Sequence, residues 1–552
     1  MERTNILNGL VLLGLVAATP ADAQSLREAQ RLTENEQFAK ASNMYRSLLV
    51  NDPNSGEIWF NFGENYYLWD RTDSATYCYT RGASANPRHP LSHVGVGKML
   101  WAKGDTAAAR PHFQEAIRTA TDKTNKFPKP LQTATYRELA EAFMQGTHKD
   151  TRSALAYLDK GLTLDPNDPD AYILKGDILF DINPVDASEP LVNYKRAIDL
   201  APMSAHPIAR KALMYHRGGN YAAAIIEYTK AIEKDPSYAP AYTGRAESYF
   251  MDRKYDLATA DYDRYLELNK GDKDAMVRYA QFLYLVKKYP ESLATIKQLE
   301  AEGVSSLVLT RIKGYDLVEV GDSVNAIPTL DAYFAEQPKD KVLSSDLQYY
   351  GRAHGLVRKD SLAGEYLMQA AEMPKADPEL YAEAASYFQK ARMYTRAVDA
   401  YQKKVNSPKV AVNDWYYLGG LANRAKEYAL ADSAWAKYIE KQPNIHQGYM
   451  GRARANVGMD PDKQTWQARP FYEDALRRIK PEDITKARVD YEEACFYLGF
   501  YHFYSTKDLP AAKCWFEKVK ALSSGTANAK VASDMLLSKE LKDVTAAPCE
   551  LQ

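Results

Sequence analysis

Residues 53–87 read PNSGEIWFNFGENYYLWDRTDSATYCYTRGASANP, and the spacing within this stretch decides the fold. Trp59 and Gly63 are four residues apart and therefore share one face of a helix. Ala75 and Tyr79 repeat this spacing on a second helix, which the closing proline cannot continue. Because a small residue on the first helix lets the second helix approach closely, the stretch predicts an antiparallel helix hairpin.

The same pattern returns along the chain at intervals close to 34 residues. Large and small residues stand at identical offsets before Pro87 and before Pro443, and Pro202 and Pro236 are also 34 residues apart. A period of 34 with this order of residues resembles the tetratricopeptide repeat, TPR. The small residue of the first helix recurs at Ala29, Gly63, Gly97, Ala140, Gly176, Ala212, Ala246, Ala280, Gly314, Gly351, Ala385, Gly419, Ala453 and Gly499.

The resemblance implies about 14 repeats in an all-α, right-handed superhelical solenoid of helix hairpins. One hairpin cannot bury its hydrophobic face alone, whereas stacked hairpins form a continuous core, so 552 residues need not divide into several globular domains. Arrays of this kind mostly hold other molecules. We therefore expect a non-catalytic scaffold that binds a protein or an extended peptide segment, in one superhelix or in two.

Charge and motif content narrow the function further. The net charge is −1 with 26% charged residues, which argues against a nucleic-acid binder, because such a protein needs a basic stripe against phosphates. Neither a Gly-x-Ser-x-Gly elbow nor an H-E-x-x-H motif occurs. We expect no catalytic residue, no cofactor and no metal site.

The N-terminus has the features of a secretory signal. An apolar run of about 13 residues ends before Ala21-Asp22-Ala23, which fits a cleavage site, although Glu2 weakens the positive charge that such signals carry. The run is too short to span a membrane, and no later stretch is apolar enough. We expect residues 1–23 to be a signal peptide and the protein to be periplasmic, outer-membrane-associated or secreted by a bacterium.

The remaining chain divides into a TPR array, residues 24–523, and a C-terminal capping helix and tail, residues 524–552. A loop from Gly458 to Pro470 separates two helices of one repeat. It is either a functional projection or a drifted insertion, and Trp466 within it could equally fold back onto the core.

Four cysteines remain in a chain for which export would permit disulfides: Cys78, Cys495, Cys514 and Cys549. Buried free thiols are the favoured interpretation. Cys495 and Cys514 lie on the two helices of the last repeat and could approach each other, and the sequence does not decide whether they pair.

A row of large side chains predicts the binding surface. In proteins that the chain resembles, positions one turn after each small residue tend to face the ligand in the concave groove. These positions hold mostly aromatic residues in the first two-thirds of the array, and the charged residues directly after the small ones share that face. The candidate partner-binding residues are Tyr67, Trp101, Phe180, Phe250, Tyr284, Glu64, Lys98, Asp177 and Glu247.

Two interpretations of this row stay open. If the row is a binding surface, Trp101, Phe180 and Phe250 should be partly exposed; otherwise they pack against neighbouring repeats.

Three functions also stay open. The first is a protein-binding scaffold for assembly or secretion in the envelope, associated there with an outer-membrane complex. The second is a carbohydrate- or peptidoglycan-binding module, because aromatic rows with carboxylates also suit sugars. The third is an accessory subunit of an envelope enzyme, or a hydrolase built on the loop at Gly458–Pro470.

Overall fold

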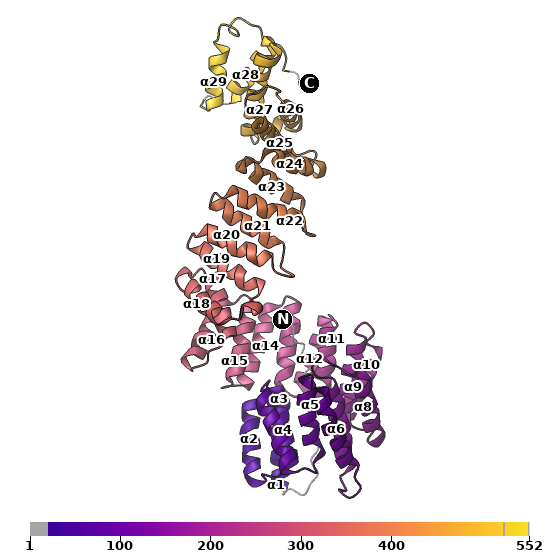
Figure 1. Cartoon of the computed structure of the whole chain (residues 1–552). Helices are drawn as coiled ribbons and strands as arrows, with labels where there is room; N and C mark the ends of the chain where they lie inside the picture. The colour runs from indigo at the N-terminus through magenta and orange to yellow at the C-terminus, as the bar shows by residue number, and fades with distance from the viewer. Residues whose placement is uncertain (1–19, 523–524, 550, 552) are drawn as a thin grey trace. The chain divides into compact units, whose positions relative to one another are not determined.

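A computed structural model describes residues 20–522, 525–549 and 551, and in these residues the protein is built from α-helices without strands (Figure 1). The predicted signal peptide falls largely on residues 1–19, which lie outside the described residues. The contacts divide the chain into two units, Met1–Val304 (unit 1) and Ser305–Gln552 (unit 2).

The helices of unit 1 are α1 (Pro20–Glu34), α2 (Phe38–Asn51), α3 (Gly56–Leu68), α4 (Thr72–Ala85), α5 (Pro90–Ala102), α6 (Thr106–Thr121), α7 (Lys129–Phe143), α8 (Thr151–Leu164), α9 (Pro169–Ile182), α10 (Ser188–Leu200), α11 (His206–Arg217), α12 (Tyr221–Lys234), α13 (Ala239–Met251), α14 (Tyr255–Leu268), α15 (Lys273–Leu285) and α16 (Tyr289–Ala301).

The helices of unit 2 are α17 (Leu307–Glu319), α18 (Ser323–Glu336), η1 (Lys339–Lys341), α19 (Ser344–Leu356), α20 (Asp360–Ala371), α21 (Glu379–Lys390), α22 (Tyr394–Val405), α23 (Val412–Ala425), α24 (Tyr428–Lys441), α25 (His446–Met459), α26 (Arg469–Arg478), η2 (Pro481–Asp483), α27 (Arg488–Tyr501), η3 (His502–Thr506), α28 (Leu509–Leu522) and α29 (Ala527–Leu536).

Helices α1 to α28 pair in chain order as fourteen hairpins in the described chain, and every predicted small residue lies on the first helix of its hairpin. The packing explains why these positions are small. A Cβ atom on Gly63 would lie 2.3 Å from the ring of Tyr79, and one on Gly419 would lie 2.7 Å from the indole of Trp435. Distances that short cannot be accommodated without moving a helix, so the predicted register is confirmed.

Unit 1 closes on itself, because its first hairpins contact its seventh and eighth. The indole nitrogen of Trp69 donates to the Asp274 carboxylate at 2.8 Å, and Arg71 contacts the same carboxylate at 2.6 Å. Lys40 donates to the carbonyl oxygen of Leu268. The first helices of the hairpins therefore face an interior that is enclosed along the turn.

In unit 2 the loop after α25 is folded onto the next hairpin. The Asp460 carboxylate accepts hydrogen bonds from the backbone N–H groups of Gln464, Thr465 and Trp466, which fixes the loop conformation. Trp466 is buried against the rings of Tyr497 and Tyr501. The interpretation in which Trp466 returns to the core is confirmed.

The C-terminal tail is covalently attached to the last hairpin. Cys514 on α28 forms a disulfide with Cys549, whereas Cys495 is a buried free thiol. The expectation of free thiols is therefore wrong for Cys514 and Cys549, and Cys514 does not pair with Cys495. The reason is that the chain after α29 returns to α28, where Lys513 donates to the carbonyl oxygen of Val544 at 2.6 Å.

None of the helices that the structure describes combines the length and apolarity needed to cross a membrane.

Candidate functional site

The row of large side chains in unit 1 is mostly a seam between hairpins. Trp101 and Phe180 are each 3% exposed, so the expectation that they would be partly exposed is wrong. Trp101 packs on Phe113 of its own hairpin and on Phe143 of the next, and its indole nitrogen donates to the carbonyl oxygen of His148. A large side chain one turn after the small residue therefore fills the space between the first helices of successive hairpins.

Three other members of the row remain accessible. Tyr67, Phe250 and Tyr284 are half-buried. Phe250 packs on Tyr255 and Phe282, and the hydroxyl of Tyr67 donates to Gln145 at 2.5 Å. The role of these three rings in binding a partner stays a prediction.

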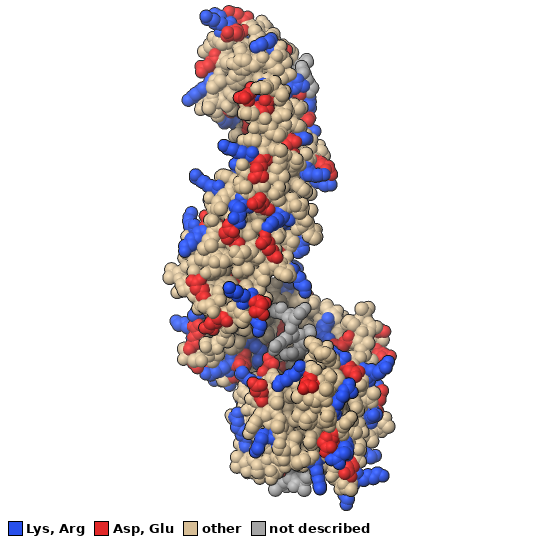
Figure 2. Space-filling view, viewed as in Figure 1, with Lys and Arg blue, Asp and Glu red and all other residues tan. Residues whose placement is uncertain are grey.

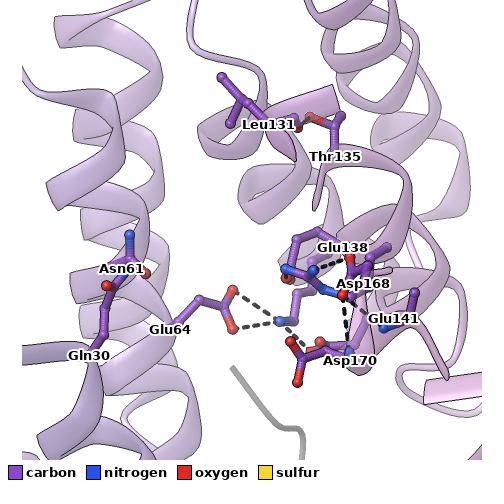
Figure 3. Close-up of polar contacts among 12 residues, drawn as sticks. Gln30, Asn61, Glu64, Leu131, Thr135, Glu138, Glu141, Asp168 and Asp170 are labelled. Carbon is purple, nitrogen blue, oxygen red and sulfur yellow. Dashed lines mark hydrogen bonds and ion pairs between the residues drawn. The ribbon is translucent and has the colours of Figure 1, made fainter. Parts of the chain in front are cut away.

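The charged residues beside the row form a buried network centred on Lys98 (Figure 3). The Lys98 ammonium lies 2.9 Å and 3.0 Å from the two Glu64 oxygens and 2.6 Å from Glu141. Lys98 and Glu64 are fully enclosed, and Tyr79 donates a further hydrogen bond to Glu64. The network joins α3, α5 and α7, so it fixes the first helices of three successive hairpins.

The network continues along α7 to the start of α9 (Figure 3). Arg137 contacts Asp168 at 2.7 Å and Glu138 at 3.3 Å. Burial and the neighbouring Glu141 and Glu64 carboxylates raise the pKa of Glu138 to about 8, and burial raises the pKa of Asp170 well above its ordinary value. The buried cations are thus too few to keep every carboxyl group ionised.

Asp177, the next predicted residue, is also buried and paired. Its carboxylate contacts Arg210 of α11 and accepts a hydrogen bond from Tyr194 of α10, both at 2.5 Å. Asp177, like Glu64 and Lys98, holds adjacent hairpins together in the interior, where the predicted interaction surface was expected.

A second set of carboxyl groups on the first helices reaches solvent inside unit 1. Glu247 is exposed, and Glu34 and Glu57 are partly exposed. Burial and the neighbouring Asp235 carboxylate raise the pKa of Glu34 to about 8. Burial raises the pKa of Glu57 to about 7, and burial together with the Glu36 carboxylate raises the pKa of Glu247 to about 7. Unit 1 thus carries, on its first helices, carboxyl groups whose pKa values are raised toward neutral pH.

One group of carboxylates has the spacing of a cation site. Ligand oxygens of Glu64, Glu138 and Glu141 lie within 4.8 Å of one another. Lys98 contacts two of these three residues and occupies the position that a metal ion would need. The arrangement is therefore satisfied by the chain's own ammonium group.

The sequence reasoning missed Glu141, although a signal for it was present. Glu141 directly follows the small residue Ala140, and this is the relation that Glu64 has to Gly63. Glu138 and Asp170 occupy other positions relative to their small residues, and nothing in the repeat pattern marks them. The outer surface gives no such signal, because Lys and Arg are mixed with Asp and Glu over the face in view (Figure 2).

A family model of the TPR repeat matches residues 212–252, which cover part of α11, all of α12 and α13 and the one residue after α13. The chain carries tetratricopeptide repeats. The matched segment has the helix lengths and the register of the other hairpins, in which the same small and large positions pack together. As a TPR array, the chain is a scaffold for protein–protein interaction, of a fold that is typically non-catalytic.

Solved structures with TPR folds are similar to parts of this chain. The C-terminal part of a TPR repeat-containing protein from Cytophaga hutchinsonii is 28% identical, with a TM-score of 0.38 over 46% of this chain and 98% of that one. Yeast Tom70 is 12% identical, with a TM-score of 0.33 over 74% and 96%. PilW, a widely conserved type IV pilus biogenesis factor, is 18% identical, with a TM-score of 0.32 over 38% and 95%. No curated protein matches the sequence.

Proposed function

We propose that the protein is an exported scaffold whose unit 1 interior holds a basic segment of a partner protein during assembly or secretion in a bacterial envelope. The raised pKa values of Glu34, Glu57 and Glu247 on the first helices of unit 1 are the observation that carries this proposal. Export and the envelope setting rest on the apolar run and the Ala21-Asp22-Ala23 site of the N-terminal sequence.

Charge complementarity argues for a basic partner. Carboxyl groups with pKa values near 7 and 8, such as Glu34, Glu57 and Glu247, are partly protonated at neutral pH, because burial disfavours their charged form. A lysine or arginine side chain placed among them would supply the missing cation. The half-buried rings of Tyr67 and Phe250 would add contact area and cation–π attraction.

This arrangement predicts that binding is coupled to proton release. A bound cation favours the ionised form of each carboxyl group and lowers its pKa, so protons leave when the segment binds. The affinity should therefore rise between pH 6 and pH 8 and should fall with salt, because the exposed part of the interaction is screened.

The test is calorimetric titration of the full mature chain with three 15-residue peptides of matched length, one rich in Lys and Ala, one in Glu and Ala, and one neutral. The basic peptide should bind more tightly at pH 8 than at pH 6. The double variant Glu34→Gln with Glu247→Gln should weaken binding by at least about tenfold. A control, Asp199→Asn with Glu233→Gln, removes the same charge from exposed positions on second helices and should change little.

Equal binding of all three peptides would contradict the charge argument. Mass spectrometry of the protein from its native host tests export separately, and a mature chain beginning near Gln24 is expected. A chain that keeps Met1 in its native host would contradict the envelope setting and leave the peptide result untouched.

A further inference from the structure

The concave face of unit 2 contains a hollow of about 670 Å³ between α21, α23 and α25. Small residues create it. Ala382 and Ser386 of α21 and Gly420 of α23 occupy inner-face positions. In the neighbouring hairpins such positions carry Arg352 and Arg454.

The packing of the chain does not require a glycine at position 420. A Cβ atom on the neighbouring Gly419 or on Gly451 would collide with the Trp435 indole, whereas a Cβ atom on Gly420 would meet nothing within 4 Å. Glycine inside a helix is less stable than alanine, and its usual use is to allow close approach of another molecule to the backbone. The open space in front of Gly420 is thus a feature of the hollow that the packing of the chain does not explain.

Two residues that line the hollow each have a buried polar atom without a hydrogen-bond partner. Trp435 is 5% exposed, and its indole N–H donates to no atom of the described chain. The side-chain oxygen of Asn423 likewise accepts no hydrogen bond there, although the amide nitrogen of Asn423 donates to the carbonyl oxygen of Gly451. A buried polar atom without a partner is costly, so one unused donor and one unused acceptor in the same hollow point to a ligand that supplies both.

The walls combine aromatic faces with planar polar groups. Tyr416 and Tyr417 are 37% and 51% exposed, and Tyr416 is held by edge contacts to Trp435 and Tyr438. Gln389 and Gln447 line the hollow with exposed amides, and Arg424 lines it with an exposed guanidinium group.

Along the groove, an ion pair lies on each side of the hollow. Arg352 of α19 contacts Glu383 of α21 at 2.6 Å, and Arg454 of α25 contacts Asp490 and Glu493 of α27, each at 2.6 Å. A space bounded in this way suits a compact ligand better than a chain that runs along the whole groove. Arg454 and Asp490 line the hollow as an ion pair, and Arg424 lines it without an ion pair within the part of the chain that the structure describes.

We propose that this hollow is a binding site for a short saccharide, distinct from the peptide-binding interior of unit 1. A sugar ring has an apolar C–H face that packs on tyrosine rings, and each of its hydroxyl groups both donates and accepts. Such hydroxyl groups suit a wall whose residues hold an unused donor, the Trp435 indole N–H, and an unused acceptor, the Asn423 oxygen. The amides and Arg424 bind further oxygens, including a carboxylate where the sugar carries one.

The experiment is calorimetric titration of the full mature chain with tetrasaccharides of glucose, of N-acetylglucosamine and of galacturonic acid, and with a neutral tetrapeptide. At least one saccharide should bind with a Kd between about 10 μM and 1 mM. Gly420→Leu should weaken that binding at least about tenfold without lowering the melting temperature, because its side chain enters open space. Tyr417→Ala should weaken it about three- to tenfold, whereas Tyr504→Ala, a change at another exposed tyrosine of unit 2, should not.

Preference for the uronic acid over the neutral sugars would assign Arg424 to a carboxylate. The proposal is overturned if no saccharide binds at 5 mM, if Gly420→Leu leaves the affinity unchanged, or if the tetrapeptide binds to the hollow in preference to every saccharide. Because these probes and variants concern unit 2, their failure leaves the proposed binding of a basic segment to unit 1 unaffected.

Discussion

Lys98→Met removes the cation that contacts both Glu64 and Glu141 inside unit 1 and replaces it with an apolar side chain of similar length. All three side chains are almost fully enclosed, so the two carboxylates cannot recover hydration after the change. Breaking a buried ion pair in this way costs about 3–5 kcal/mol. At about 2 °C per kcal/mol, appropriate to a large unit, the melting transition of unit 1 should fall by roughly 6–10 °C at neutral pH.

The loss should depend on pH in a defined direction. Without Lys98 the chain folds only with the two carboxyl groups protonated, whereas in the unfolded chain these groups ionise near pH 4.3. Each proton taken up on folding costs about 1.4 kcal/mol per pH unit above that value, which amounts to about 4 kcal/mol between pH 5 and pH 8. The variant should therefore be close to wild type at pH 5 and strongly destabilised at pH 8.

Thermal melts followed by circular dichroism at pH 5, 6.5 and 8 measure this dependence, and hydrogen exchange in α3, α5 and α7 locates it. Lys404→Met in unit 2 is a matched control, because Lys404 is as buried as Lys98 but contacts Glu379, whose side chain is 64% exposed. Glu379 can regain water, and the second partner Asp414, 3.5 Å from Lys404 and 10% exposed, keeps a hydrogen bond from the backbone N–H of Ala411, so the control should show a smaller loss with less pH dependence. An equal loss for Lys98→Met at pH 5 and pH 8 would refute the electrostatic reasoning and leave only lost packing.

Three further changes have expected outcomes. Trp101→Ala should cost about 3–5 kcal/mol because the ring is core, whereas Phe250→Ala should cost clearly less because its ring is half-buried; equal shifts in thermal melts would contradict this. Cys549→Ser opens a disulfide between residues that are 35 apart, and a loop of that length predicts a loss of about 3–4 kcal/mol of stability. Hydrogen exchange in α28 measures this loss, and unchanged protection there would contradict the prediction. Glu138 binds a proton up to about pH 8 in the folded chain but not in the unfolded chain, so its contribution to stability is lost as the pH rises through 8. Lowering the pH from 8 to 6.5 should therefore stabilise unit 1 by up to about 2 kcal/mol. If the stability of Glu138→Gln depends on pH as the wild type does, the effect belongs to another group.

The fold could be predicted from the sequence because its determinants are local. Gly63 and Tyr79 lie within one hairpin, and their contact recurs in each hairpin with the period of the sequence. The division at Val304 could not be read in this way, because the hairpins on both sides of it keep the same register. The disulfide between Cys514 and Cys549 was equally hidden, since the path of the tail after α29 follows no period.

The candidate site was only partly predictable, because the repeat fixes which face a residue occupies but not what stands opposite. Lys98 and Glu64 were placed correctly on the inner face, yet their burial depends on Glu141 from the next hairpin. Trp101 was assigned to the same face and is instead enclosed by Phe113 and Phe143. Whether an inner-face side chain is exposed is thus decided by the sizes of its neighbours one hairpin away.

The two units use the same inner face in opposite ways. In unit 1 the first helices carry carboxyl groups such as Glu138 and Glu247, whose pKa values are raised mainly by burial, so that folding at neutral pH is opposed by the cost of their ionisation. In unit 2 the space in front of Gly420 is open, and the nearby Trp435 and Asn423 each keep a buried polar atom without a hydrogen-bond partner.

Each arrangement would be stabilised by its own occupant. A ligand that binds only the folded chain adds about 2.7 kcal/mol at one hundred times its Kd. Saturating basic peptide should therefore raise the melting transition of unit 1 most at pH 8, where the carboxyl groups most lack protons. A bound saccharide should protect α23 and α25 from hydrogen exchange with little dependence on pH, because neither the Trp435 indole nor the Asn423 amide titrates.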